Sequence, residues 1–572
     1  MTKTISLADY LFKRLRQIGV DSLFGVPGDY NLTLLDHVEP SGIHWVGNAN
    51  ELNAGYAADG YARIRGCGAL VTTFGVGELS AINAIAGAYA ERAPVVHIVG
   101  SPGRPTQEER RLVHHTFNDG EFSRFAKMYE SVTVASASLR DARTAAKQID
   151  ETLRECLLQS RPVYIDIPVD MVDVQVDAAS LETDIEQPEV VSTDAQQKVL
   201  DQVMERIRHA KSPIIVVDGE TRSHRVVEEV ESLVKTTGWP TWTTAFGKGL
   251  IDETITNFHG IYQGSYDEQH VQDIFNSADL ILSFGQHDSW TNTYAYTTIP
   301  KPAVTISFAD TAIFLDGQKH RDISLKHTLQ HLLSSLTLQP PSPHPRAAEL
   351  QHPPHPPIPT SGPLSQLHLW HALNPFLQPG DIVLGETGTS GHGCRQFHLP
   401  SGCKMFLPAT WLSIGYMLPA SLGAALAQRD LRASKDYKGK LGTRTLLFIG
   451  DGSFQMTAQE MGTIIREELD VVVFLVNNDG YTIERCIHGL REGYNDVARW
   501  RWDLAPAFFG AEEGRKVRRV GTWEELGEMM EDEEVREGKG LRMVELLLER
   551  EDAPEGPLKE MVGVQQKLAG SR

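Results

Sequence analysis

The sequence predicts a multidomain α/β protein whose sheets are mainly parallel. Short apolar runs, each bounded by glycine or proline, alternate with helical patterns over most of the 572 residues. Continuously apolar strands separated by helices are typical of parallel sheets covered on both faces. A chain of this length also exceeds one hydrophobic core, so several domains are expected. The runs lie at 69–75, 94–100, 162–168, 213–219, 279–285, 445–450, 471–478 and 542–548.

Two shifts in composition divide the chain into blocks. An acidic stretch without periodicity follows the strand at 162–168, and residues 339–363 hold ten of the 30 prolines. Prolines at that density exclude a helix or a central strand and favour a semi-rigid linker. Histidines among them could capture a metal, but a plain linker is the favoured interpretation. We expect domains at 1–185, 190–338 and 364–572, with the linker at 339–363.

Charge and composition narrow the possible partners. The formal net charge is -21, which disfavours nucleic acid and anionic membrane surfaces. No apolar run is long enough to span a bilayer. The five cysteines are scattered without a CxxC pair, so they indicate reduced thiols in a cytoplasmic protein. Asp9 and Asp21 argue against reading the amphipathic N-terminus as a mitochondrial presequence.

The strongest motif lies in the third block, where the strand at 445–450 runs into a helix through Gly450-Asp451-Gly452-Ser453. Glycines let a ligand approach the backbone closely, and the free N–H groups of a helix start attract phosphate. The Asp451 carboxylate would repel phosphate unless a hard divalent cation lay between them. Magnesium is the best candidate for that cation.

A second motif completes this pattern 27 residues after Asp451. The strand at 471–476 ends in "NNDGYTIE", where Asn478 offers an amide oxygen and Gly480 a backbone carbonyl. Both are hard neutral donors suited to magnesium. The glycine turn alone would be weak, but the two motifs at this spacing resemble the signature of thiamine diphosphate enzymes. That resemblance implies three doubly wound parallel-sheet domains, which bind the pyrimidine, connect the halves and bind the diphosphate.

The resemblance also implies a set of cofactor contacts. Glu51, at the head of a helix rich in small residues, would activate the aminopyrimidine; taken alone, it could be an ordinary acid at a helix N-terminus. Ile414 resembles the residue that bends the cofactor. Leu412 stands where the family usually has glycine, and leucine would be strained if the position needs a positive φ. The implied cofactor-binding residues are Glu51, Thr387, Thr389, Leu412, Ile414, Asp451, Gly452, Ser453, Asn478 and Gly480, with Asp451, Asn478 and Gly480 on the metal.

Two adjacent histidines, His114 and His115, admit three interpretations: a metal site, a proton-handling site, or surface composition. Neighbouring residues point oppositely on a strand and do not share a helix face, so one metal held by both is disfavoured. Together with Asp29, Glu51 and Glu484 they resemble pyruvate decarboxylase and related 2-oxo acid decarboxylases of fungal type.

That family resemblance implies a role for each of these side chains. Glu484 would handle the substrate carboxylate and protonate the reacting carbon. Asp29 and His115 would assist protonation and aldehyde release, and His114 would relay protons or orient its neighbour, facing away from the reacting carbon.

The implied reaction is nonoxidative decarboxylation of a 2-oxo acid through a thiamine diphosphate ylid, with pyruvate giving acetaldehyde and carbon dioxide. An aromatic 2-oxo acid is an alternative substrate, because Gly391 removes bulk and His392 adds a titratable group near the expected pocket. An inactive, filament-forming homologue is a second alternative, and a synthase-like carboligase is less favoured. Glu220 replaces a cysteine of yeast-type members and could pair with Arg92. A homodimer assembling to a homotetramer is expected.

Overall fold

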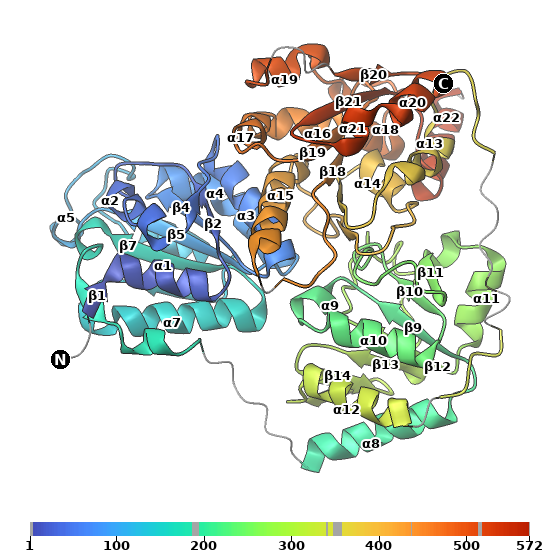
Figure 1. Ribbon diagram of the computed structural model, residues 1–572, viewed down its shortest axis with the longest axis horizontal. Helices are drawn as coiled ribbons and strands as arrows, with labels where there is room; N and C mark the ends of the chain where they lie inside the picture. Colours follow the sequence, from blue (N-terminus) through green and yellow to red (C-terminus); the bar gives the residue numbers. More distant parts are fainter. Residues whose placement is uncertain are drawn as a thin grey trace.

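The computed structural model describes residues 4–185, 194–338, 341–346, 350, 357–435, 437–512 and 517–570 (Figure 1). These residues form three large sheets dominated by parallel strands, which confirms the predicted α/β class. Each apolar run identified in the sequence corresponds to a strand. The boundary expected at 186–189 and much of the expected linker at 339–363 fall outside the described residues, so those limits stay predictions.

The first sheet is parallel throughout and carries helices on both faces. Buried residues of α1 (Leu7–Gln17) and α7 (Ala142–Gln159) pack on one face. Those of α3 (Glu51–Arg65) and α4 (Val76–Ala90) pack on the other. The strand order is β3 (His44–Trp45), β2 (Ser22–Gly25), β4 (Gly68–Thr73), β5 (Val95–Ser101), β7 (Val163–Pro168), β6 (Ser136–Ser138).

The central sheet begins parallel and ends in an antiparallel hairpin that the sequence analysis did not anticipate. Asp316 and Gly317 form the two-residue turn, with φ of 52° and 77°. Positive φ at both positions matches the twist of a tight hairpin, so an Asp-Gly pair suits this turn. The strand order is β11 (Phe258–Ile261), β10 (Thr241–Thr243), β9 (Pro213–Val217), β12 (Leu280–Phe284), β13 (Thr305–Phe308), β14 (Ala312–Leu315), β15 (Gln318–Arg321).

The third sheet is again parallel throughout. One face is covered by α15 (Met417–Ala433) and α17 (Glu460–Arg466), the other by α13 (Gln366–Leu373) and α20 (Trp523–Glu531). No helix within the described ranges is both long and apolar enough to cross a membrane. The strand order is β17 (Lys404–Phe406), β16 (Ile382–Gly385), β18 (Thr445–Gly450), β19 (Val471–Asn477), β21 (Arg542–Leu547), β20 (Arg518–Val520).

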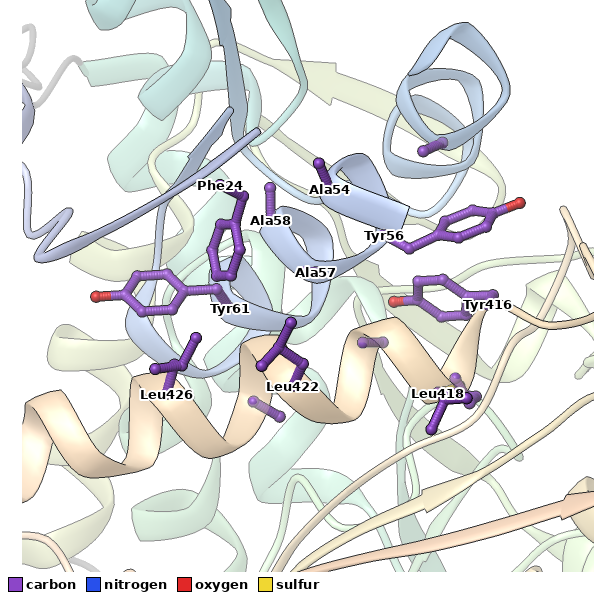
Figure 2. Packing of buried hydrophobic residues seen from close by; sticks show 14 of the residues in the cluster. Phe24, Ala54, Tyr56, Ala57, Ala58, Tyr61, Tyr416, Leu418, Leu422 and Leu426 are labelled. Atoms are coloured by element: carbon purple, nitrogen blue, oxygen red, sulfur yellow. The ribbon is translucent and has the colours of Figure 1, made fainter. Parts of the chain in front are cut away.

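The first and third domains meet where α3 packs on α15 (Figures 1 and 2). A Cβ atom at Gly60 would overlap the carbonyl of Ala420, and one at Gly423 would overlap the carbonyl of Ala57. The two helix backbones therefore touch without intervening side chains, which the small residues of α3 permit. One hydrophobic cluster runs through this contact from the first sheet to the third.

We predict that Gly423→Ala destabilises the full chain by about 1–3 kcal/mol, because the added methyl group cannot fit against the Ala57 carbonyl without moving a helix. Gly527→Ala is the matched control, since Gly527 is exposed in α20 and a Cβ there would meet no atom within 4 Å. Its better helix propensity should stabilise by about 0.5–1 kcal/mol. Urea unfolding midpoints measure both, and equal effects from the two variants would contradict the close packing.

Candidate active site

Three oxygen donors converge at the carboxyl ends of β18 and β19. Asp451 is the first residue of α16 (Asp451–Thr457), and its carboxylate accepts the N–H groups of Gly452 at 2.8 Å and Gly480 at 3.0 Å. The Asn478 amide nitrogen donates to the Gly480 carbonyl at 2.9 Å and to Asp451 Oδ1 at 3.3 Å, and its oxygen accepts the Thr482 hydroxyl at 2.9 Å. A carboxylate, an amide and a backbone carbonyl are hard ligands, and with its oxygen turned inward the amide would complete such a set around a cation. The residues predicted for magnesium therefore fit a hard divalent cation.

Burial shapes the charge of this group. Removal from water raises the pKa of Asp451 to about 6, even though two backbone N–H groups favour its ionised form. A bound cation would favour the carboxylate and reverse that shift. Next to it, a Cβ atom at Gly452 would lie 2.5 Å from the Tyr481 ring, so glycine is the residue that fits beside the helix start.

The loop after β16 offers polar groups with open hydrogen-bonding capacity. Gly388 has φ 106° and ψ −150°, a conformation open essentially to glycine, and Thr389 then begins α14 (Thr389–Cys394). Within the described chain, the buried hydroxyls of Thr387 and Ser390 have no hydrogen-bond partner. Unpaired buried hydroxyls are costly, so they fit a polar ligand such as a diphosphate or pyrimidine. Ser390 was missed by the sequence analysis.

Glu386, also missed, ties this loop to the start of α15. Its carboxylate accepts the N–H of Thr387 at 2.8 Å and of Met417 at 2.9 Å. Complete burial raises its pKa to about 7. In the sequence, Glu386 is visible only as an acidic residue at the end of an apolar strand. Whether such a residue is buried depends on which segments pack against the end of the strand.

The segment before α15 is held by residues of the first domain. Glu91 accepts three consecutive backbone N–H groups, from Ala409 at 2.8 Å, Thr410 at 2.9 Å and Trp411 at 3.2 Å. The Ser413 hydroxyl lies 2.7 Å from the Tyr56 hydroxyl. These contacts fix both ends of a short segment that contains the predicted cofactor residue Leu412.

Leu412 has φ 54°, so the condition for strain identified in the sequence is met. Left-handed backbone costs a branched residue roughly 1–2 kcal/mol relative to glycine. Its side chain lines a small crevice with Tyr56, Trp411 and Tyr416, so the bulk of the leucine is accommodated. Ile414, two residues on, is half-buried.

Glu51 begins α3, as expected, and its side chain occupies space left open by a glycine. A Cβ atom at Gly77 would lie 3.0 Å from Glu51 Oε1. Burial raises the pKa of Glu51, whereas an acid that merely served a helix N-terminus would have its pKa lowered. Within the described part of one chain, no hydrogen bond or ion pair joins Glu51 to the Asp451 group.

Asp29, His114 and His115 come together in the first domain. His114 Nε2 lies 2.6 Å from Asp29 Oδ2, and His115 Nε2 lies 3.9 Å from Asp29 Oδ1. The expectation that the two histidines point in opposite directions is wrong, because their ring centroids are 4.6 Å apart. His115 has φ 63°, which breaks the alternation of an extended chain and turns both rings toward Asp29.

A buried acid that the sequence analysis missed supports this trio. A Cβ atom at Gly75 would overlap the backbone carbonyl of His115, so the two segments are in contact. Glu78 accepts the Gly75 N–H at 2.7 Å and the Tyr164 hydroxyl at 2.8 Å. Burial raises the pKa of Glu78 to about 8.

Glu484 is exposed in α18 (Thr482–Ile487), and no described contact joins its side chain to the trio within one chain. Two other expectations about the pocket are wrong. A Cβ atom at Gly391 would lie 2.7 Å from the Glu386 carbonyl, so close packing accounts for this glycine without reference to substrate size. Burial and the nearby Arg395 lower the pKa of His392 well below its usual range, so it stays neutral.

The suggested pairing of Arg92 with Glu220 is confirmed, with Arg92 Nε 2.9 Å from Glu220 Oε2. Glu220 also lies 3.1 Å from His287 Nδ1, and the other ring nitrogen of His287 contacts the Thr410 hydroxyl. The central domain is thereby connected to the segment that precedes Leu412.

Comparison with known proteins places the three domains in one family. Residues 5–123 match the thiamine pyrophosphate enzyme N-terminal TPP binding domain, 200–336 the central domain, and 386–545 the C-terminal TPP binding domain. A pyruvate decarboxylase of Aspergillus parasiticus is 53% identical over 97% of this chain and 96% of its own length. A pyruvate decarboxylase of Candida glabrata is 40% identical, covering 96% of both chains. Pyruvate decarboxylase isozyme 1 of Saccharomyces cerevisiae is 38% identical over 97% and 98%.

We predict a pH dependence of stability from Glu78. Its folded pKa of about 8 lies above the ordinary 4.5, so the folded protein holds this proton more tightly than the unfolded chain. The resulting stability is present at low pH and is lost as pH rises from about 4.5 to about 8. Between pH 5 and pH 8, the unfolding free energy of the native chain should therefore fall more than that of Glu78→Gln. The difference should be on the order of a few kcal/mol.

Glu151→Gln is the control, because Glu151 is an exposed acid on α7. Its curve should follow that of the native chain. A native curve parallel to that of Glu78→Gln would contradict the raised pKa.

Proposed function

This chain belongs to the pyruvate decarboxylase family of thiamine pyrophosphate enzymes, and we propose that it converts pyruvate to acetaldehyde and carbon dioxide without oxidation. The observation that carries the proposal is that Asp29, His114 and His115, three side chains able to handle protons, lie together. The relative with 53% identity, which matches over 96% of its own length, is a pyruvate decarboxylase. The aromatic substrate alternative has lost its support, since Gly391 is required for packing.

Thiamine diphosphate supplies a carbon nucleophile and an electron sink when bound. We assign its diphosphate to Gly452, Ser453 and the loop carrying Thr387 and Thr389, where unpaired hydroxyls support a polar ligand. Magnesium is proposed at Asp451, Asn478 and Gly480, because a buried carboxylate, an amide and a backbone carbonyl, all hard ligands, lie within hydrogen-bonding distance of one another. Leu412 and Ile414 are assigned to the segment that contacts the cofactor rings.

Glu51 is proposed to hold and move a proton at the aminopyrimidine. Burial raises its pKa, so the side chain holds a proton more readily than a solvated glutamate does. The side chain belongs to a helix whose far end is fixed against α15, which limits its freedom to reorient.

Asp29, His114 and His115 are proposed to deliver and remove protons during aldehyde release. A histidine hydrogen-bonded to a carboxylate can exchange a proton with little rearrangement, and a second imidazole beside it extends the path. Glu484 is assigned to the substrate carboxylate and to protonation at the reacting carbon. Since neither Glu484 nor Asp451 contacts the trio within one chain, we propose that two chains complete each site.

A homodimer is therefore the proposed minimum active unit, with a homotetramer as the larger assembly. A cytoplasmic location is proposed as well, because the five cysteines are all buried free thiols.

We predict that the purified chain, supplied with thiamine diphosphate and Mg²⁺, releases acetaldehyde from pyruvate. Turnover on phenylpyruvate and indolepyruvate should be lower in kcat/KM, since packing against the Glu386 carbonyl accounts for the glycine at 391 that suggested a larger substrate. Aldehyde formation with each acid measures this directly. Preference for an aromatic acid would overturn the proposed substrate, and tight cofactor binding without turnover on any acid would favour the inactive homologue.

We predict that Glu51→Gln binds thiamine diphosphate yet slows exchange of the cofactor's acidic ring proton with deuterium by about 100-fold or more, because an amide cannot move a proton there. Exchange is measured by acid quench and NMR of the bound cofactor. Glu151→Gln, an exposed acid in the same domain, should exchange at the native rate. Native exchange in Glu51→Gln would refute the role assigned to Glu51.

A further inference from the structure

The geometry of the trio points to a second cation site, distinct in chemistry from the magnesium group. We propose that Asp29, His114 and His115 bind a zinc-type divalent ion. One ligand atom from each residue lies within 4.8 Å of the other two. Among the residues that the structure describes, this is the one group of three His, Cys, Asp or Glu side chains with that property.

The separations are close to those of a tetrahedral centre. Bonds of about 2.0–2.1 Å from zinc to nitrogen and oxygen place neighbouring ligand atoms roughly 3.3 Å apart. His114 Nε2 lies 2.6 Å from one Asp29 oxygen, Oδ2, and His115 Nε2 lies 3.9 Å from the other, Oδ1, so the carboxylate faces both imidazoles at distances on either side of that value. Because no two of the three ligand atoms are more than 4.8 Å apart, shifts of at most about 1.5 Å, within the reach of side-chain rotation, would bring three ligands to this spacing.

The two imidazoles are already held in position. The Tyr30 ring stacks on His114 with centroids 5.0 Å apart and planes 10° apart. His115 is fixed through its backbone, because its carbonyl packs against Gly75 and its φ of 63° sets the direction of the side chain. A site that is organised before the ion arrives loses less conformational entropy on binding. Adjacent histidines were not expected to share a metal because neighbours in a regular helix or strand point in different directions. His115, with φ 63°, lies in neither conformation.

The donor set selects the ion. Two imidazole nitrogens and one carboxylate suit Zn²⁺, Co²⁺, Ni²⁺ or Cu²⁺, whereas Mg²⁺ prefers oxygen donors such as those of the Asp451 group. The side chains of Asp29, His114 and His115 are 49%, 58% and 31% exposed, so an ion can enter and a water can complete the coordination. The free cysteines, all buried, do not compete for it in the folded protein.

An ion at this place would occupy the atoms that the proposed function uses to move protons. Zinc should therefore act as a reversible inhibitor that does not compete with thiamine diphosphate. This consequence rests on the proposed function, but the binding site itself does not.

The experiment uses the full chain loaded with thiamine diphosphate and excess Mg²⁺, which keeps the oxygen group saturated. Equilibrium dialysis against a zinc-buffering chelator counts zinc per chain, and Co²⁺ reports tetrahedral coordination through its visible absorption. His114→Gln, His115→Gln and Asp29→Asn should each weaken the tightest zinc site by more than about tenfold. The Co²⁺ band should be lost with it.

His270→Gln is the matched control, because His270 is a half-exposed histidine 3.1 Å from Glu268 in the central domain, and no second imidazole joins that pair. Its zinc affinity should equal that of the native chain. Retention of the tightest zinc site in the three cluster variants would overturn the proposal. Tight binding that persists because the linker histidines hold the metal would count as such a result. Zinc that is lost from the variants but leaves native turnover intact would support the site and contradict the proton-handling role.

Discussion

The contact between the α3 and α15 backbones determines how the candidate site is built. Gly60 and Gly423 let each helix reach a carbonyl of the other, at Ala420 and Ala57. Both helices begin at or near residues proposed to contact the cofactor: Glu51 is the first residue of α3, and Leu412 and Ile414 lie within five residues of Met417, where α15 begins. Close-packed interiors transmit small displacements, so a change in helix spacing would move both ends of the site together.

Buried charge reinforces this contact. Glu91 is enclosed completely, yet its pKa is lowered, because Arg63 and the backbone N–H groups of residues 409–411 outweigh desolvation. Arg63 also pairs with Asp59, so no member of this buried network is left without a partner of opposite sign. One carboxylate of the first domain thereby holds three consecutive peptide groups of the third. Removing it would leave the Arg63 guanidinium with Asp59 as its one carboxylate partner in this network and would free three N–H donors, which is more costly than the loss of one hydrogen bond.

Features that depend on the pattern of residues within a short segment could be predicted from the sequence. Apolar runs bounded by glycine predicted the strands, because a strand buried on both faces tolerates few polar residues. Asp451 and Asn478 were predictable because neighbouring parallel strands end at the same edge of a sheet. Glu78 and Glu386 were not, since the raised pKa of each results from burial by segments distant in sequence. The orientation of His115 was mispredicted for a related reason: its left-handed backbone is imposed by packing on Gly75.

Leu412 is the strongest argument that this chain could keep the fold and lose the activity, and the structure weakens that argument. The backbone at this position has φ 54°, the region that glycine occupies freely, so the leucine adopts a conformation that a glycine could also adopt there. Strain of roughly 1–2 kcal/mol persists only where the surroundings enforce it. Here the three N–H groups bound by Glu91 precede Leu412, and the Ser413–Tyr56 contact follows it. The substitution costs stability at a position whose geometry is imposed from both sides, so a departure from the family pattern does not by itself imply a departure from its chemistry.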